Sequence, residues 1–138
     1  MNLQKSPPNS CLPTSFAMAC DVKVSDFIGL YGQAIVWADL PHPYCYRGWH
    51  IQECILAAYK LGYAAIVLAP EVWLGVDSEH LTSIKTNIPL CNRMVLLTDK
   101  HAVASDGKKV YDPKGYVYDL SELLPFVKII CLIHEIKS

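Results

Sequence analysis

The sequence predicts an α+β domain in which N-terminal helices pack on a C-terminal antiparallel β-sheet. Apolar residues recur with helical spacing before residue 63, and short runs rich in β-branched and aromatic residues follow. The two patterns do not alternate, as they would in a series of βαβ units. The 138 residues have the length of one ordinary domain. We therefore predict a single domain over residues 1–138.

The first helix is expected to begin near Cys11 and to continue to Cys20. Leu12, Phe16 and Cys20 follow one another at four-residue spacing, which places them on one face of a helix. Pro13 would lie in the first turn, where its missing N–H costs nothing because that donor has no intrahelical partner. The proline thus supports a helix start at this point.

Two further helices are expected in the same half of the chain. A short one covers residues 26–31, and a longer one covers residues 51–61, where the apolar residues form one stripe that ends at Gly62. Residues 37–49 contain prolines and aromatic residues without a period of either 3.6 or 2, which predicts an irregular loop.

The C-terminal half is expected to form the sheet. A short helix over residues 120–124, capped by Asp119, should precede the last strand. The expected strands cover residues 64–68, 93–98, 101–105, 109–112 and 127–136.

The composition excludes several classes of protein. Apolar residues make up 52% of the chain and charged residues 18%, which excludes a disordered chain. The formal net charge is −1 and no long basic cluster is present, so we expect no nucleic-acid partner. The apolar runs are too short to cross a membrane, and the N-terminal segment does not have the pattern of a secretory signal. A cytoplasmic protein without membrane contact is therefore expected.

The six cysteines are expected to be reduced, because an apolar chain of this length does not need disulfides to be stable. His42, Cys45 and His50 form a partial metal-ligand set, but no second ligand pair stands out, and we predict no metal site. Four cysteines have apolar neighbours and are expected to fill the core: Cys20, Cys54, Cys91 and Cys131.

Cys11 is the candidate nucleophile. A thiol reacts as its thiolate, and the N-terminus of a helix favours an anion because its N–H groups are unpaired and its dipole is positive there. The same N–H groups could stabilise the oxyanion that forms when the sulfur attacks a carbonyl carbon.

A hairpin supplies the candidate base and the residue that orients it. Asp106-Gly107 is a favoured two-residue turn, and with that turn His101 would lie directly opposite Asp112 on one face of the sheet. A carboxylate in this place would fix the tautomer of the imidazole and stabilise its charged form. The alternative is that His101 is an exposed strand residue and Asp112 the start of an Asp-Pro turn.

These segments resemble those of a known family. The stretch NSCLPTSFAM over residues 9–18 is similar to the nucleophile helix of papain-like cysteine peptidases, in particular the bacteriocin-processing, double-glycine leader peptidase group. The segments HAVA, starting at His101, and YDP, around Asp112, resemble the histidine strand and Asp-Pro motif of that group. Leu12 stands where the family usually has glycine.

The resemblance implies a papain-like fold, no cofactor and one further site residue. Gln4 occupies the place of the glutamine whose side-chain amide contributes to the family's oxyanion hole, with Gln33 and Gln52 as alternatives.

We therefore predict a thiol hydrolase that cleaves a peptide or isopeptide amide through a thioester intermediate. Cys11 would be the nucleophile, His101 the general base and acid, and Asp112 the residue that orients His101. The expected partner is a peptide or protein substrate. Two alternatives remain open: a peptide-binding module without activity on the same fold, and a peptidoglycan amidase or acyltransferase that uses the same residues.

Overall fold

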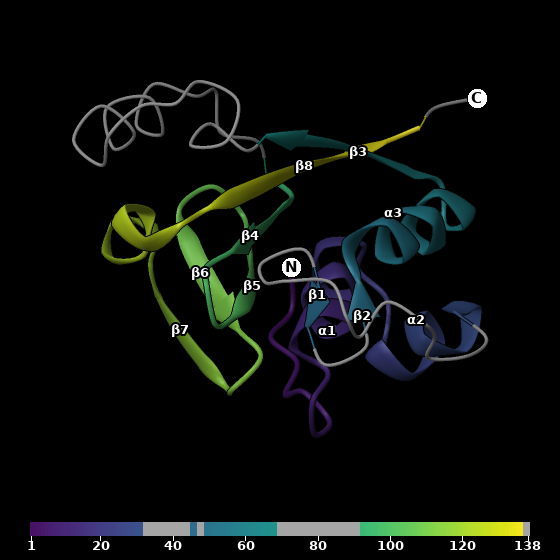
Figure 1. Ribbon diagram of the computed structural model, residues 1–138, viewed down its shortest axis with the longest axis horizontal. Helices are drawn as coiled ribbons and strands as arrows, with labels where there is room; N and C mark the ends of the chain where they lie inside the picture. Colours follow the sequence, from purple (N-terminus) through teal and green to yellow (C-terminus); the bar gives the residue numbers. More distant parts are fainter. Residues whose placement is uncertain (32–44, 47–48, 69–91, 137–138) are drawn as a thin grey trace.

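The computed structural model (Figure 1) describes residues 1–31, 45–46, 49–68 and 92–136, and the structural statements below concern these residues. Helices pack on a six-stranded antiparallel sheet, which confirms the predicted α+β class. No helix in the described ranges is both long enough and apolar enough to cross a membrane.

The three helices lie where the sequence predicts them. Helix α1 covers Cys11–Ala19, α2 covers Val24–Tyr31 and α3 covers Ile51–Lys60. Helix α2 starts two residues earlier than expected. Gly62 follows α3 with a φ of 92°, a left-handed conformation that glycine adopts without strain.

The sheet has the strand order β3-β8-β4-β5-β6-β7. Strand β7 was not predicted: it is a short edge strand, most of whose side chains are exposed, so it lacks the buried alternation that marks a strand in sequence. The strands are β3 (Tyr63–Leu68), β4 (Met94–Leu97), β5 (Ala102–Ser105), β6 (Lys109–Asp112), β7 (Tyr116–Asp119) and β8 (Ile129–Glu135).

Two other segments differ from expectation. The expected irregular loop contains a small antiparallel ribbon, β1 (Cys45–Tyr46) and β2 (Trp49–His50). The expected helix before β8 is instead two 3-10 turns, η1 (Leu120–Glu122) and η2 (Leu124–Phe126). Pro125 disfavours the α conformation at the residue before it, and the carboxylate of Asp119 bonds Lys109 instead of capping a helix.

The sheet separates two clusters of buried apolar side chains. The three helices cover one face of the sheet, and the two 3-10 turns lie against the other. Strand β4 illustrates the arrangement, because Val95 and Leu97 belong to the helix-side cluster while Met94 and Leu96 belong to the opposite one.

Helix α1 packs directly against β5. Ala102 belongs to the helix-side cluster, and Ala104 shares its face of the strand. Because alanine side chains are short, the helix can approach the strand closely. This packing brings the N-terminus of α1 near the residue that precedes β5, His101.

Candidate active site

Cys11 is the first residue of α1, with Ser10 as the N-cap. The first helical hydrogen bond runs from the N–H of Thr14 to the carbonyl of Ser10 at 3.0 Å, so the N–H of Cys11 precedes the intrahelical ladder. The following residues of the helix are all buried, whereas Cys11 is partly exposed. The thiol is therefore accessible beside unpaired helix N–H groups.

The β5–β6 hairpin has a different register from the predicted one. Ser105 pairs with Val110 instead of Lys108, so β6 is displaced by two residues and His101 is not directly opposite Asp112. A two-residue displacement keeps every side chain on its face, because side chains alternate with a period of two. His101 lies just before β5 and Asp112 ends β6, so the two residues remain at the same end of the hairpin although they are not directly opposed.

The turn of this hairpin explains the displacement. A two-residue Asp106-Gly107 turn of the favoured type needs positive φ at both residues, but only Gly107 has one, at 93°. The carboxylate of Asp106 instead accepts hydrogen bonds from the N–H groups of Lys108 and Lys109, at 2.9 and 2.8 Å. The Asp106 side chain therefore caps the turn, and the tip of the hairpin lies further along the chain than predicted.

The expected hydrogen bond between His101 and Asp112 is nevertheless present. Nε2 of His101 lies 2.6 Å from Oδ1 of Asp112. Cys11 lines the same cavity as His101 and its side chain helps to raise the pKa of the imidazole; since Nε2 faces Asp112, Nδ1 is the nitrogen left for the sulfur. The imidazole thus lies between the carboxylate that it bonds and the thiol.

Asp112 is held by more groups than the sequence predicted. Its Oδ1 also accepts the N–H of Lys114 at 2.9 Å, and the hydroxyl of Tyr118 donates to Oδ2 at 3.4 Å. Its carbonyl accepts the N–H of Gly115 at 2.8 Å, so Asp112 does begin an Asp-Pro turn, as the alternative interpretation had it. Tyr118 was missed because it lies on β7, the strand that the sequence pattern does not reveal.

These contacts favour a charged imidazole. Burial alone would lower the pKa of His101, but the hydrogen bonds and charges of Asp112 and Cys11 outweigh it and raise the pKa to about 9. Burial would raise the pKa of Asp112, yet the bonds from His101 and the N–H of Lys114 hold it below its ordinary value. An imidazolium–carboxylate pair is therefore stable around neutral pH.

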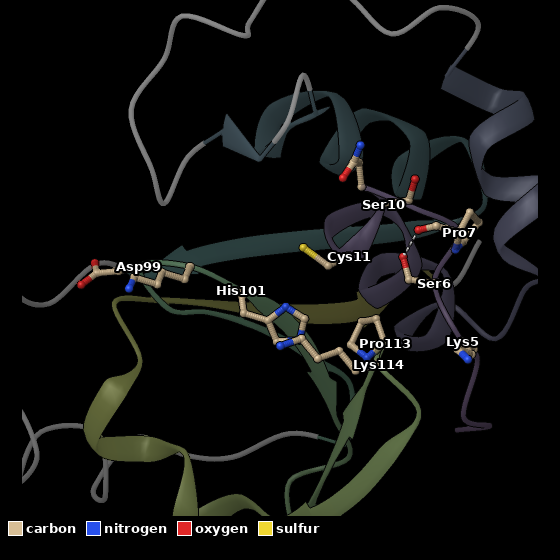
Figure 2. Close-up of a pocket in the computed structure, with 11 residues that line it drawn as sticks. Lys5, Ser6, Pro7, Ser10, Cys11, Asp99, His101, Pro113 and Lys114 are labelled. Atoms are coloured by element: carbon tan, nitrogen blue, oxygen red, sulfur yellow. Dashed lines mark hydrogen bonds between the residues drawn. The ribbon is translucent and has the colours of Figure 1, made fainter.

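Cys11 and His101 line one cavity of about 590 Å³ (Figure 2). Its walls come from three parts of the chain: the N-terminal segment, the β4–β5 turn and the β6–β7 turn. A substrate group in this cavity would contact both the sulfur and the imidazole.

The structure does not bring Gln4 to this site, which corrects its assignment to the oxyanion hole. Its Nε2 donates to the carbonyl of Val22 at 2.6 Å, and its Oε1 accepts the N–H of Val24 at 2.8 Å. Both contacts lie beyond the C-terminal end of α1, whereas Cys11 is at the N-terminal end. Of the alternatives, Gln52 is exposed on α3 and Gln33 lies outside the described residues.

His50 has a structural role. Its Nδ1 accepts the N–H of Gln52 at 3.0 Å, which caps α3, and burial lowers its pKa. His42, the first member of the partial metal-ligand set, lies outside the described residues, as does Cys91. The other three cysteines expected in the core are buried: Cys20, Cys54 and Cys131.

Comparison with known proteins adds no assignment. No family model matches the chain, and a search of curated proteins found no similar sequence.

Proposed function

We propose that this protein is a thiol hydrolase with a papain-like arrangement of Cys11, His101 and Asp112. The observation that carries the proposal is the convergence of a thiol and an imidazole on one cavity at the start of a helix, with a buried carboxylate bonded to the imidazole from behind. A buried cysteine or a lone surface histidine would not need this chain of contacts.

The first step would be attack of the Cys11 thiolate on an amide carbonyl. The imidazolium of His101 would give the proton on Nδ1 to the leaving amine, and Asp112 would keep Nε2 in place throughout. The products of this step are a free amine and a thioester on Cys11.

The second step would be hydrolysis of the thioester. His101, now neutral, would take a proton from water and return it to the sulfur as the acid leaves. In both steps the negative oxygen would lie near the N–H groups at the start of α1, with Cys11 supplying the first of them. No cofactor takes part in this sequence.

A peptide or isopeptide amide in a peptide or protein is the proposed substrate. The same three residues serve a peptidoglycan amidase or an acyltransferase, in which the amide or the final acceptor differs. We place the activity in the cytoplasm.

Alkylation with iodoacetamide tests the mechanism without knowledge of the substrate. We expect Cys11 to be labelled selectively at pH 7, because it is partly exposed beside an imidazolium. Cys20 and Cys131 are buried, and burial raises the pKa of each thiol to about 12, so both should resist labelling. His101→Ala should slow labelling of Cys11 at least tenfold.

Turnover on a peptide and isopeptide library then tests activity. Cys11→Ala should abolish hydrolysis and change the free energy of unfolding by less than about 1 kcal/mol. Cys54→Ala is the matched control, since it removes a buried sulfur and should cost stability while activity remains. Hydrolysis by Cys11→Ala would refute the mechanism.

A second candidate is a peptide-binding module without activity. The position of Gln4 favours it, because that side chain does not supply the donor that the family uses in the oxyanion hole. Slow, uniform labelling of several thiols, unaffected by His101→Ala, would support the binding module.

A further inference from the structure

The cavity at Cys11 differs in charge from the rest of the chain. The chain has a formal net charge of −1, but three lysines line the cavity against one aspartate: Lys5, Lys100, Lys114 and Asp99. The carboxylate of Asp112 does not offset them, because it is buried and paired with His101. The cavity therefore attracts anions although the whole protein does not.

Two of the lysines are placed together by backbone contacts. The N–H of Ser6 donates to the carbonyl of Pro113 at 2.7 Å, which holds the segment that carries Lys5 against the turn that carries Lys114. The N–H of Lys114 in turn donates to Asp112. The backbone next to Lys5 is thus bonded to the turn that carries Lys114, and the backbone of Lys114 is bonded to Asp112.

The charges on the two sides of the cavity are unequal. Asp99 and Lys100 are consecutive on the β4–β5 turn, so their opposite charges offset each other. Figure 2 shows Asp99 to the left of His101, with Lys5 and Lys114 to its right. Within the described residues neither Lys5 nor Lys114 forms an ion pair, in contrast to Lys109, which bonds Asp119. Positive charge without a partner is concentrated on one side.

We propose that Lys5 and Lys114 select the substrate by binding a carboxylate close to the scissile amide. The inference rests on the proposed function, because it names the substrate class of the same site. An acidic side chain or the free C-terminal carboxylate of a peptide could supply this group. Substrates with a neutral residue at that position are disfavoured.

A pair of alkylating reagents measures the charge beside Cys11 directly. Iodoacetate and iodoacetamide react with the same sulfur, but only iodoacetate carries a carboxylate. The ratio of interest is the rate constant for iodoacetate divided by the rate constant for iodoacetamide. We expect the double variant Lys5→Gln/Lys114→Gln to lower this ratio at Cys11 by about threefold to tenfold. The ratio in the wild type should also fall as salt is raised, because salt screens exposed charges.

Two variants control this experiment. Lys5→Arg/Lys114→Arg keeps both charges and should keep the wild-type ratio. Lys60→Gln/Lys108→Gln removes two exposed lysines that do not line the cavity and should leave the ratio unchanged. An unchanged ratio in Lys5→Gln/Lys114→Gln, or an equal fall in the control, would overturn the inference.

Three peptide libraries distinguish the two sources of the carboxylate. One contains glutamate and an amidated C-terminus, one contains glutamine and a free C-terminus, and one contains glutamine and an amidated C-terminus. Wild type should cleave one of the first two at least fivefold faster than the third, and Lys5→Gln/Lys114→Gln should remove that preference. Cleavage of all three at equal rates would refute the lysine pair while leaving the hydrolase intact. If no library is cleaved and Cys11 is not selectively labelled, the proposed hydrolase function is refuted. The ratio of alkylation rate constants then still tests whether Lys5 and Lys114 attract a carboxylate.

Discussion

Asp112 connects the chemistry of the site to the backbone around it. Its carboxylate bonds His101, the N–H of Lys114 and the hydroxyl of Tyr118, and its carbonyl closes the β6–β7 turn. The side chain therefore has little freedom to rotate, and it fixes which nitrogen of His101 faces Cys11. Its charge also keeps His101 protonated, which has consequences for pH dependence.

We predict that kcat/KM declines above about pH 9, where His101 loses its proton. In Asp112→Asn the negative charge that favours the imidazolium is gone, so the pKa of His101 falls and the decline should begin about one to two pH units lower. Asp112→Asn should impair turnover less than Asp112→Ala, and His101→Ala should impair it most. Asp106→Asn, a change in the other aspartate of the hairpin, should leave the pH profile unchanged. An unshifted profile in Asp112→Asn would contradict the role of Asp112.

The free energy of unfolding should also depend on the protonation of His101. The ordinary pKa of histidine is 6.5 and that of His101 is raised to about 9, so the folded protein binds the proton more tightly than the unfolded chain. This stabilisation is fully present below about pH 6.5 and is lost as the pH rises through about 9. Urea unfolding of wild type across this range should show a loss that His101→Gln does not show.

The β5–β6 hairpin shows which features of an element the sequence can predict and which it cannot. The two strands follow from alternation, and the approach of His101 to Asp112 follows from the Asp106-Gly107 signal. The register does not, because the carboxylate of Asp106 can either point away or cap the turn, and both choices fit the same residues. The hydrogen bond was predictable since both registers leave His101 and Asp112 at the same end of the hairpin.

The helices were more predictable than the edges of the sheet. Helix α3 has an apolar stripe and a terminal glycine, and these signals are local. Strand β7 and the contacts of Tyr118 depend on pairing with β6, which leaves little trace in a short exposed segment. The role of Gln4 was also beyond local reasoning, because its partners lie near residues 22–24 and only the folded chain brings them together.

We predict that the Asp106 side chain stabilises the hairpin. Asp106→Ala removes the acceptor of two backbone N–H groups and of the Tyr111 hydroxyl, which lies 3.1 Å away, and should cost about 1–2 kcal/mol of unfolding free energy. Asp106→Asn keeps an acceptor oxygen and should cost less. The backbone bonds and the Tyr111 bond outweigh burial and lower the pKa of Asp106, so its contribution is present above about pH 4 and is lost at lower pH. Equal stability of Asp106→Ala and wild type at pH 7 would show that the backbone alone holds the turn.

In the whole molecule, the N-terminal segment joins the connection after α1 to the β6–β7 turn beside the site. Gln4 fastens it to the connection between α1 and α2, and Ser6 fastens it to the β6–β7 turn. Arg93, which precedes β4, donates to the carbonyl of Ala19 at the end of α1, and its guanidinium carbon lies 5.0 Å from the centroid of the Tyr63 ring. The connection after α1 is therefore held from the N-terminal segment and from the sheet.

The variant Gln4→Ala separates a structural role of this side chain from a catalytic one. Gln4→Ala removes two hydrogen bonds to backbone groups that are partly buried, so we expect a loss of about 1–3 kcal/mol in unfolding free energy. Turnover per folded molecule should fall by less than tenfold, because the side chain does not reach the cavity that holds Cys11. Gln52→Ala, at an exposed position on α3, should change the unfolding free energy by less than about 0.5 kcal/mol. A loss of about 100- to 1000-fold in turnover with unchanged stability, measured by urea unfolding and peptide cleavage on the same samples, would return Gln4 to the oxyanion hole.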